Sequence, residues 1–432
     1  MISLKFLDIF QIFSVMVAIT LTVFYLYQFI YIVYAIFHRH VPVVPEAKEN
    51  HRYAIFISAR NEQGVVYELL DSLMAQDYPK DRYDVYLVAD NCTDNTAGVA
   101  REHGAYVFER ENHEQVGKGF ALNYLYAEVN KLKGEGYYDA YIVFDADNIV
   151  DDQFLKEANK TFDTGKFDAF TTYRNSKNYD GNWISTAYSI WFMHEARHLN
   201  YPRMMMGAQC MISGTGFCVS DKVMRANGGW PYYLLTEDIQ FSVASTLKNL
   251  RIGYCDTAIL YDEQPTSMKQ SWRQRLRWAK GFYQIDGKYI GQLLKGFWTL
   301  KGRKLACYDV LMTVIPCSLL TVATILISAY VLCAAWFMPY YAMMVFRQQI
   351  FVLLGLTLLN FYAGLIVMGA LTIHMESPRI HTTPWKKWKN LWLFPVFMLT
   401  YLPITIQAMF AKVKWTPIQH YSTEQLNDAN KN

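Results

Sequence analysis

Long stretches of the chain contain no Asp, Glu, Lys or Arg, and they limit which folds the sequence can adopt. These stretches are Ile9–Phe37, Val310–Phe337, Gln348–Ile373 and Leu391–Phe410. A helix of roughly 20 apolar residues is long enough to cross the hydrocarbon core of a bilayer. The sequence therefore predicts an N-terminal transmembrane helix (residues 1–40), C-terminal transmembrane helices (residues 306–412) and a tail (residues 413–432).

Basic residues near the ends of these stretches predict their orientation, because cytoplasmic loops are enriched in Lys and Arg. The loop before the last stretch is basic from Arg379 to Lys389, whereas the preceding loop carries only Arg347. This pattern places the central region in the cytoplasm and the N-terminus outside, in a multi-pass protein of the plasma membrane. Pro395 and Pro403 leave open whether the last stretch spans the bilayer or is re-entrant, and so which side holds the tail.

The rest of the chain is polar enough to form a soluble domain. The whole sequence is 52% hydrophobic and only 18% charged, which is too apolar for an ordinary soluble enzyme and too charged for membrane helices alone. Its formal net charge is +3, so the charge balance gives no sign of a nucleic-acid partner. A soluble domain joined to membrane helices fits both values.

Residues 50–283 read as an α/β domain. Short apolar runs have the length of strands: Tyr53–Ser58, Val85–Ala89 and Tyr141–Phe144. Segments with helical spacing separate them, such as Val65–Ala75 and Ala97–His103. This alternation predicts a parallel sheet that binds its ligands at the carboxyl ends of the strands. Residues 284–305 mix basic and apolar side chains, which favours an amphipathic helix on the membrane surface over an ordinary solvated helix.

Two carboxylates follow the predicted strand that ends at Phe144. Asp145 and Asp147 are separated by one residue, and along an extended strand such residues point to the same side. Mg²⁺ or Mn²⁺ usually takes one or two carboxylates together with phosphate oxygens. The pair therefore predicts a divalent-metal site at the end of the strand, with a solvated turn as the alternative.

Polar residues also follow the other two predicted strands. The first strand ends in the run that contains Ser58, Arg60 and Glu62, and Asp90 follows the second strand. These residues are candidates for ligand binding at the shared edge of the sheet. For the run after Asp90, Asx turns and helix capping are a compatible alternative. Lys118 lies between two glycines and offers a cation that could meet a phosphate.

Two further runs carry charged side chains near the end of this domain. The acidic pair Glu237 and Asp238 reads as the start of a helix, where acids commonly offset the helix dipole. Gln274 and Arg277 are three residues apart, so they share one face of a helix. Arg277 can clasp a diphosphate, Gln274 can hydrogen-bond to it, and Trp278 offers a flat surface for a sugar ring. A surface helix beside the membrane is the alternative.

Taken in order, these runs resemble those of the family-two glycosyltransferases. The resemblance rests on FISARNE, VADNCTDNT, GKG, FDAD, SGTGF, LTED and QRLRW, from about Arg52 to Gly281. The set is most similar to that of processive synthases of cellulose, mixed-linkage β-glucan, hyaluronan, chitin and poly-N-acetylglucosamine. The resemblance implies a type-A glycosyltransferase domain, Rossmann-like and cytoplasmic, inserted between transmembrane helices. The chain departs from many such relatives in its one predicted N-terminal membrane helix instead of two. No cyclic-dinucleotide-binding extension is recognised in it, so regulation by a cyclic dinucleotide is not expected.

The resemblance also implies a role for each matching residue. The uridine would be contacted by Asp90, with Ser58, Arg60 and Glu62 nearby. Asp145 would bind the nucleotide and Asp147 the Mg²⁺ or Mn²⁺ ion, while Asp238, with Glu237 beside it, would act as catalytic base. The diphosphate and acceptor would be covered by Gln274, Arg277 and Trp278.

The resulting prediction is an inverting, processive enzyme that polymerises UDP-glucose into a β-glucan with 1,3, 1,4 or mixed linkages and secretes it. Its partners would be the nucleotide sugar, the growing polysaccharide and the lipid bilayer. Two alternatives stay open: a hyaluronan, chitin or poly-N-acetylglucosamine synthase, and a non-processive transferase with a lipid acceptor. A transporter is disfavoured, because the C-terminal apolar stretches lack the ionisable residues that coupled transport usually needs.

Overall fold

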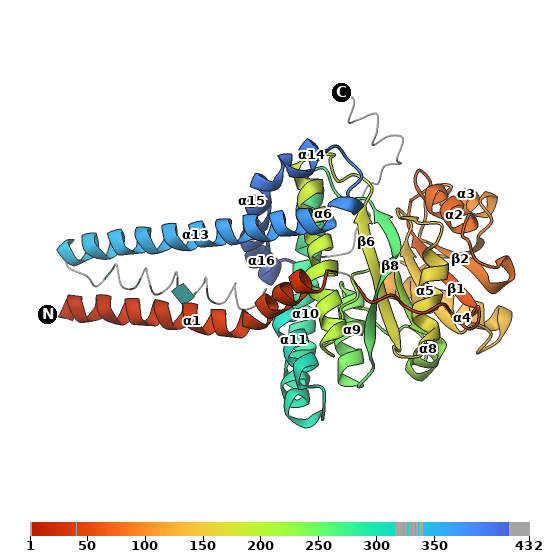
Figure 1. Cartoon of the computed structure of the whole chain (residues 1–432), viewed down its shortest axis with the longest axis horizontal. Helices are drawn as coiled ribbons and strands as arrows, with labels where there is room; N and C mark the ends of the chain where they lie inside the picture. The colour runs from red at the N-terminus through yellow and green to blue at the C-terminus, as the bar shows by residue number, and fades with distance from the viewer. Residues whose placement is uncertain are drawn as a thin grey trace.

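The computed structural model describes residues 2–39, 41–315 and 340–413, together with isolated positions between 316 and 339. Figure 1 shows a domain of strands and helices from which two long helices project side by side. Most of the predicted run Val310–Phe337, and the tail after residue 413, lie outside the described residues.

The centre of the domain is an eight-stranded sheet in the order β3-β2-β1-β4-β7-β6-β8-β5. The strands are β1 (Tyr53–Ala59), β2 (Tyr83–Asp90), β3 (Tyr106–Arg110), β4 (Ala140–Asp145), β5 (Ile149–Val150), β6 (Ala169–Ser176), β7 (Phe217–Ser220) and β8 (Ile252–Asp262). β1 is parallel to β2 and β4, β2 is parallel to β3, and β6 is parallel to β8, whereas β7 and β5 are antiparallel to their neighbours. The three strands predicted from the sequence are confirmed, and their carboxyl ends share one edge of the sheet.

Helices cover both faces of the sheet because its strands are apolar on both sides. One face packs against α2 (Val66–Met74), α3 (Thr96–Glu102) and α5 (Phe154–Asp163). The other packs against α4 (Lys118–Lys133), α6 (Trp183–His194), α8 (Asp221–Asn227) and α9 (Glu237–Leu247). Alternate residues of β1 show the division: Ile55 and Ile57 lie with Leu69 of α2, and Phe56 lies with Leu122 of α4. The helices predicted at 65–75 and 97–103 are confirmed as α2 and α3.

A buried ion pair joins the sheet domain to the helices beside it. α6 continues through a π-helical segment, η2 (Glu195–Asn200), into α7 (Tyr201–Met205), which carries Arg203. Arg203 donates two hydrogen bonds of 2.8 Å to Asp309 of α11 (Lys304–Val314), and Tyr31 of α1 (Ile2–Phe37) donates a third of 3.0 Å. Removing one member of such a pair costs about 3–5 kcal/mol, because a buried charge is left uncompensated. The pair therefore fixes α1 and α11 against α7.

A single long helix, α10 (Met268–Thr299), runs through the predicted boundary between residues 283 and 284. The sequence suggested a separate amphipathic helix over residues 284–305, but this segment is the second half of α10, a loop and the start of α11. Arg275 in the first half of α10 donates to the Phe397 carbonyl (3.1 Å) and to the Thr400 hydroxyl (2.6 Å). The guanidinium also lies 4.1 Å from the centre of the Phe397 ring. Arg275 thus anchors the C-terminal helices on α10.

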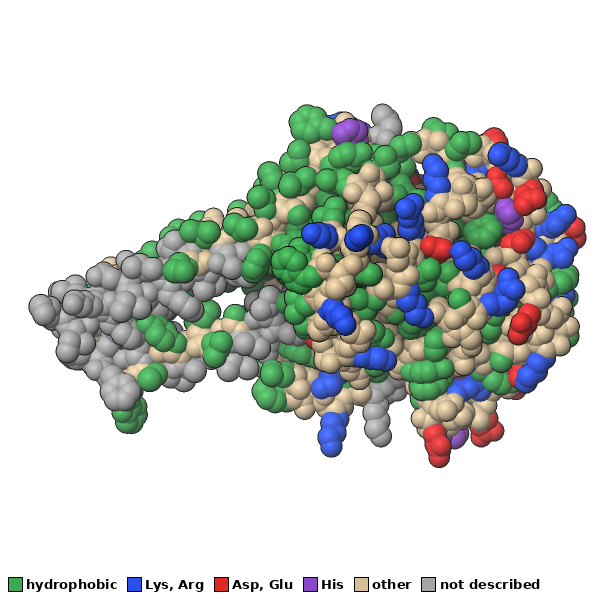
Figure 2. Space-filling model, turned by 90° about the horizontal axis from the view of Figure 1, so that it is seen from below, with side chains coloured by type: hydrophobic (Ala, Val, Ile, Leu, Met, Phe, Trp, Pro, Cys, Tyr) green, Lys and Arg blue, Asp and Glu red, His purple; other side chains and the backbone are tan. Residues whose placement is uncertain are grey.

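The projecting helices are α1 and α13 (Tyr340–Glu376) (Figure 1), and their described side chains are mostly apolar (Figure 2). In the described part of the chain, Met343–Arg379 and Pro384–Phe410 are long and apolar enough to cross a membrane, judged by length and composition. The second of these segments is divided into α14 (Pro384–Lys389), η4 (Leu391–Leu393), α15 (Phe394–Leu399) and α16 (Tyr401–Phe410). Pro395 lies in the first turn of α15, where a proline is tolerated. The stretch Leu391–Phe410 is therefore divided among η4, α15 and α16.

The basic loop between α13 and α15 packs on the sheet domain. Arg379 forms an ion pair of 2.6 Å with Asp256 of β8, and Lys386 forms one of 3.0 Å with Asp180. In Figure 2 charged side chains cover the sheet domain and its junction with the projecting helices. The positive loop and the sheet domain therefore lie on the same side of the projecting helices.

Candidate active site

The site begins at the carboxyl edge of β1, β2 and β4. Ser58 of β1 lies in register with Val88 of β2 and with Asp145, the last residue of β4. Asp90 is the last residue of β2 and pairs in register with Arg110, the last residue of β3. The parallel register alone therefore brings these side chains to one edge.

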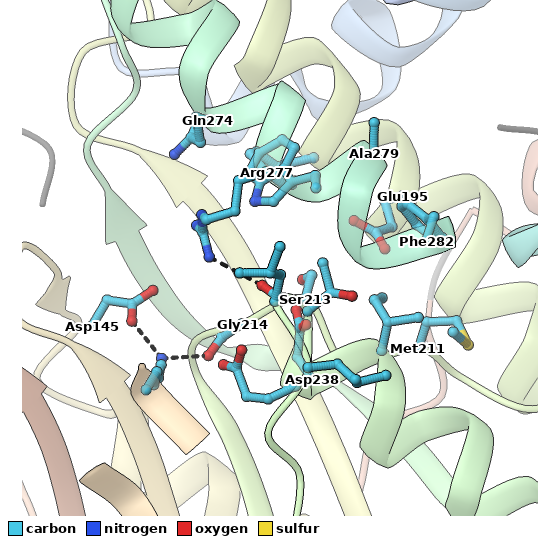
Figure 3. Close-up of a pocket in the computed structure, with 18 of the residues that line it drawn as sticks. Asp145, Glu195, Met211, Ser213, Gly214, Asp238, Gln274, Arg277, Ala279 and Phe282 are labelled. Carbon is cyan, nitrogen blue, oxygen red and sulfur yellow. Dashed lines mark hydrogen bonds and ion pairs between the residues drawn. The ribbon is translucent and has the colours of Figure 1, made fainter. Parts of the chain in front are cut away.

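A cavity of about 770 Å³ opens at this edge. All the site residues predicted from the sequence line it: Ser58, Arg60, Glu62, Asp90, Lys118, Asp145, Asp147, Glu237, Asp238, Gln274, Arg277 and Trp278. Several are labelled in Figure 3, where Asp145 and Gln274 lie on one side and Asp238 lies lower in the cavity. The structure thus brings the predicted residues together, while the role of each stays a prediction.

Lys118 connects the end of β4 with the loop before β7. Its ammonium group donates hydrogen bonds to the Asp145 carboxylate and to the Gly214 carbonyl, the second at 2.8 Å (Figure 3). A Cβ atom on Gly214 would lie 3.6 Å from Asp238 Oδ2 and 4.0 Å from Asp145 Oδ2, so the two carboxylates flank this glycine. The adjacent Gly119 has no room for a side chain, since a Cβ atom would meet the Tyr232 carbonyl at 1.8 Å. Lys118 is therefore held where it can reach an anion bound near Asp145.

Asp147 lines the cavity, but it lies in a turn and not in the extended strand that the sequence predicted. β4 ends at Asp145, and the chain then turns, with the Asn148 N–H donating to the Asp145 carbonyl at 3.3 Å. Asp145 and Asp147 therefore do not share one side of an extended strand. The Asn148 amide donates to Asp147 at 3.3 Å and to Asp262, the last residue of β8, at 2.8 Å. Asp147 thus lies beside a third carboxylate that the sequence analysis had not included.

The charges around Asp147 fit a divalent cation. Asp145, Asp147 and Asp262 are close enough that, after burial, the other two carboxylates raise the pKa of Asp262, while Arg174 lowers it. Arg174 forms an ion pair with Asp262, and Lys118 forms an ion pair with Asp145. Two cations face three carboxylates, and oxygen ligands are those that Mg²⁺ and Mn²⁺ prefer. The residues present therefore fit the predicted metal.

Asp90 is buried and forms a 2.5 Å ion pair with Arg110. Burial raises the pKa of Asp90, and Arg110 opposes that shift. The loop after β2 is tied to the loop after β1, because the Asn61 side chain accepts a hydrogen bond of 2.7 Å from the Thr93 N–H. Asn61 has a φ of 58°, which Asn tolerates better than most residues. These bonds give the candidate nucleoside end of the cavity a fixed shape.

Glu237 and Asp238 occupy the first turn of α9 and differ in exposure. Glu237 is buried, whereas part of Asp238 is open to the cavity. Burial raises the pKa of both carboxyl groups, and for Glu237 the neighbouring Asp238 adds to the shift. Lys118 and Arg277 act in the opposite direction on both. Asp238 is therefore the member of the pair that can reach a substrate, and its raised pKa makes it a stronger base than an exposed Asp.

α10 covers the cavity with one face. Arg277 donates to the Leu235 carbonyl at 3.2 Å, which holds its guanidinium near the start of α9. The buried Gln274 side-chain oxygen has no hydrogen-bond partner in the described part of the chain, so it is available to a ligand. Trp278 packs edge-on against Tyr188 with ring centres 5.9 Å apart. The QRLRW run thus has two functions: Arg277 faces the cavity, and Arg275 anchors the neighbouring helices.

At the acidic edge of the sheet, the sequence analysis missed the charged residues Arg110, Arg174 and Asp262. Asp262 ends a strand just as Asp90 and Asp145 do, so the same strand-end rule would have found it once β8 was recognised. Arg110 and Arg174 lie on β3 and β6, and their place at the site depends on strand pairing that no local pattern shows.

A separate group of metal-ligand types, Glu49, His51 and Asp163, lies away from this cavity. The His51 ring is 3.1 Å from Asp163, and the Lys48 N–H donates to the same carboxylate at 2.8 Å. These bonds hold the segment before β1 on α5, so we interpret the group as structural.

Known proteins with similar sequence identify the family. The family described as "Glycosyltransferase like family 2" matches residues 51–281, more than half of the chain. The chain therefore belongs to this family, as the ordered motifs predicted. The matched region ends inside α10, just after the QRLRW run.

Several curated relatives match at low identity. The Probable glycosyltransferase YdaM of Bacillus subtilis (strain 168) is 26% identical over 277 residues, 61% of this chain and 63% of that protein. The beta-monoglucosyldiacylglycerol synthase of Synechocystis sp. is 27% identical over 235 residues, 53% of this chain and 47% of that protein. The poly-beta-1,6-N-acetyl-D-glucosamine synthase of Staphylococcus epidermidis is 25% identical over 285 residues, 63% of each chain. The chain thus spans about half to two thirds of the length of these relatives.

Among solved structures, the mannosyltransferase PcManGT from Pyrobaculum calidifontis, in complex with GDP-Man and Mn²⁺, superposes with a TM-score of 0.53. It is 16% identical, and the match covers 92% of this chain and 98% of that chain. This likeness bears on the fold alone. With the family match it confirms the predicted type-A, Rossmann-like α/β fold.

We expect Asp238→Asn to lower turnover by roughly 10²–10⁴-fold, because it keeps the shape and removes the base. Binding of UDP should stay near that of the unaltered protein. Because the pKa of Asp238 is raised, kcat/KM should fall as the pH drops through that pKa and the base is protonated. Asp221→Asn is a matched control, since Asp221 begins α8 as an acid in a first turn but lies away from the cavity. Near-normal product yield from Asp238→Asn would contradict the assignment.

Proposed function

We propose that the protein transfers a sugar from a nucleoside diphosphate sugar to an acceptor hydroxyl with inversion at the anomeric carbon. The observation that carries this proposal is the single cavity that joins the acidic strand ends, Asp238 and Arg277. A donor with its nucleoside near Asp90 and its diphosphate near Lys118 and Arg277 would present the sugar to Asp238.

The chain's own residues have distinct tasks in this reaction. Lys118 and Arg277 offset the charge that grows on the departing diphosphate. Asp238 takes the proton from the acceptor hydroxyl while the oxygen attacks the anomeric carbon and the bond to the diphosphate breaks. One displacement converts an α-linked donor into a β-linked product, and no sugar–enzyme bond is needed. α10 excludes water from the cavity by covering it with Gln274, Arg277 and Trp278.

A divalent cation held by Asp147, with Asp145 beside it, would add Lewis-acid stabilisation of the diphosphate. We expect a chelator to abolish transfer and Mg²⁺ or Mn²⁺ to restore it. Asp147→Asn should raise the metal concentration needed for half-maximal activity and weaken binding of Mn²⁺, measured by electron paramagnetic resonance. His51→Gln, in the surface group, should change neither. Full activity in excess chelator would contradict the role of Asp147.

The finer proposal is that the donor is UDP-glucose and that the acceptor is the growing end of a β-glucan. The cavity continues past Asp238 to Tyr25 of α1, Phe361 of α13 and Tyr401 of α16, helices that the sequence places in the membrane. A product leaving the site in that direction would enter the helices directly. The basic loop that packs on the sheet domain supports a cytoplasmic site, since such loops are retained inside.

A second candidate is a single transfer to a lipid. The observation that favours it is the apolar lining of the same part of the cavity, which includes Leu199, Met211 and Phe282. The similarity to a beta-monoglucosyldiacylglycerol synthase is in line with this candidate.

The test is to give the purified protein UDP-glucose, UDP-N-acetylglucosamine and UDP-glucuronate singly and in pairs, with and without dioleoylglycerol. We expect a polymer from UDP-glucose alone that linkage-specific β-glucanases degrade. Polymer only from UDP-N-acetylglucosamine, or only from its mixture with UDP-glucuronate, would move the protein to the chitin-like or hyaluronan-like synthases. One sugar on dioleoylglycerol would exclude processivity, and no transfer from any donor would contradict the proposed function.

A further inference from the structure

The cavity contains a second set of polar side chains, on the side away from the acidic strand ends. They are Gln28 of α1, Glu195 of η2, Arg203 of α7 and Thr313 of α11. The sequence motifs include none of them. They come from elements that the Arg203–Asp309 ion pair holds together, so their arrangement is built into the fold.

Glu195 is the member of this set that lacks a partner. Its carboxylate has no hydrogen bond or ion pair among the residues that the structure describes. Arg203, whose charge acts on Glu195, is already paired with Asp309 and also donates to Thr313 at 2.9 Å. Glu195 is enclosed by protein, with its accessible part at the cavity. An unpaired carboxylate in such a place is costly unless a ligand satisfies it.

The backbone at Glu195 is unusual as well. α6 changes there from an α-helix to the π-helical segment η2, which covers Glu195–Asn200. π-Helical turns are rare and are found frequently at functional sites. Figure 3 shows Glu195 and Asp145 on opposite sides of the cavity, with Asp238 between them. Glu195 is therefore near the base but away from the candidate donor end.

The electrostatics of Glu195 agree with this position. Burial raises the pKa of Glu195 to about 7, Arg203 and Arg174 oppose the shift, and Asp238 adds to it. Asp238 is thus close enough for its charge to act on Glu195. A nucleoside diphosphate is anionic and would be repelled by Glu195, whereas a neutral hydroxyl would be a favourable partner.

We propose that Glu195 forms an acceptor subsite, in which it accepts a hydrogen bond from an acceptor hydroxyl other than the one that attacks. The acceptor then needs at least two hydroxyl groups, one at Asp238 and one at Glu195, and a sugar unit supplies them. Diacylglycerol has a single hydroxyl and would leave Glu195 unsatisfied. The inference rests on the proposed function and deepens it by naming the acceptor class.

The test compares Glu195→Gln with the unaltered protein. Transfer is measured with cellotetraose and with dioleoylglycerol as added acceptors, and polymer growth is measured when neither is added. Loss of a hydrogen bond to a charged group should lower kcat/KM for the sugar acceptor roughly 10- to 100-fold. UDP binding and the slow hydrolysis of the donor without acceptor should stay unchanged, which a misfolded protein would not show. Asp90→Asn gives the opposite pattern: a higher KM for the donor and an unchanged KM for the acceptor.

A set of cellotetraose analogues, each lacking one hydroxyl of the terminal ring, locates the contact. With the unaltered protein, one analogue should show the same decrease in kcat/KM that Glu195→Gln shows with complete cellotetraose. With Glu195→Gln, that analogue and complete cellotetraose should give the same kcat/KM. Equal acceptor kinetics for Glu195→Gln and the unaltered protein would overturn the proposal. Transfer to dioleoylglycerol without transfer to cellotetraose would also overturn it. If no donor is turned over under any condition, the proposed function itself fails.

Discussion

Negative charge is concentrated at the carboxyl edge of the sheet, and the rest of the site is arranged around it. The carboxylates come from strand ends and from the start of α9: Asp90, Asp145, Asp147, Asp262, Glu237 and Asp238. Like charges repel strongly in a partly buried site. Basic side chains from other elements oppose this repulsion: Arg110, Lys118, Arg174 and Arg277. The remaining negative charge near Asp147 is what a divalent cation would balance, so metal binding and donor binding depend on the same charge distribution.

How far the sequence predicts this arrangement differs from one residue to the next. Strand-end carboxylates such as Asp90 were found because apolar runs mark strands and parallel strands end at one edge. Asp147 was correctly predicted to lie at the cavity, but the reason was wrong, because it lies in a turn and not in an extended strand. Arg110 could not be found locally, because only the pairing of β3 with β2 brings it to Asp90. The same holds for Glu195, because its position depends on a π-helical turn that no sequence pattern predicts.

α10 links the chemistry to the helices that the sequence assigns to the membrane. Arg277 on one face reaches the cavity, and Arg275 on another holds the chain around Phe397 and Thr400. A movement of α10 would therefore affect both the cover of the cavity and the packing of α15 and α16. On the far side, the Arg203–Asp309 pair fixes α1 and α11. The candidate acceptor subsite at Glu195 lies in the cavity that α10, α7 and α11 line.

The central claim is that Asp238 activates an acceptor hydroxyl for a single direct displacement at the donor sugar. The most direct measurement is the anomeric configuration of the first bond formed, observed by proton NMR during turnover of an α-linked nucleoside diphosphate sugar. The account predicts a β-linkage from the first turnover. An α-linkage would require a second displacement or another mechanism and would contradict the role given to Asp238.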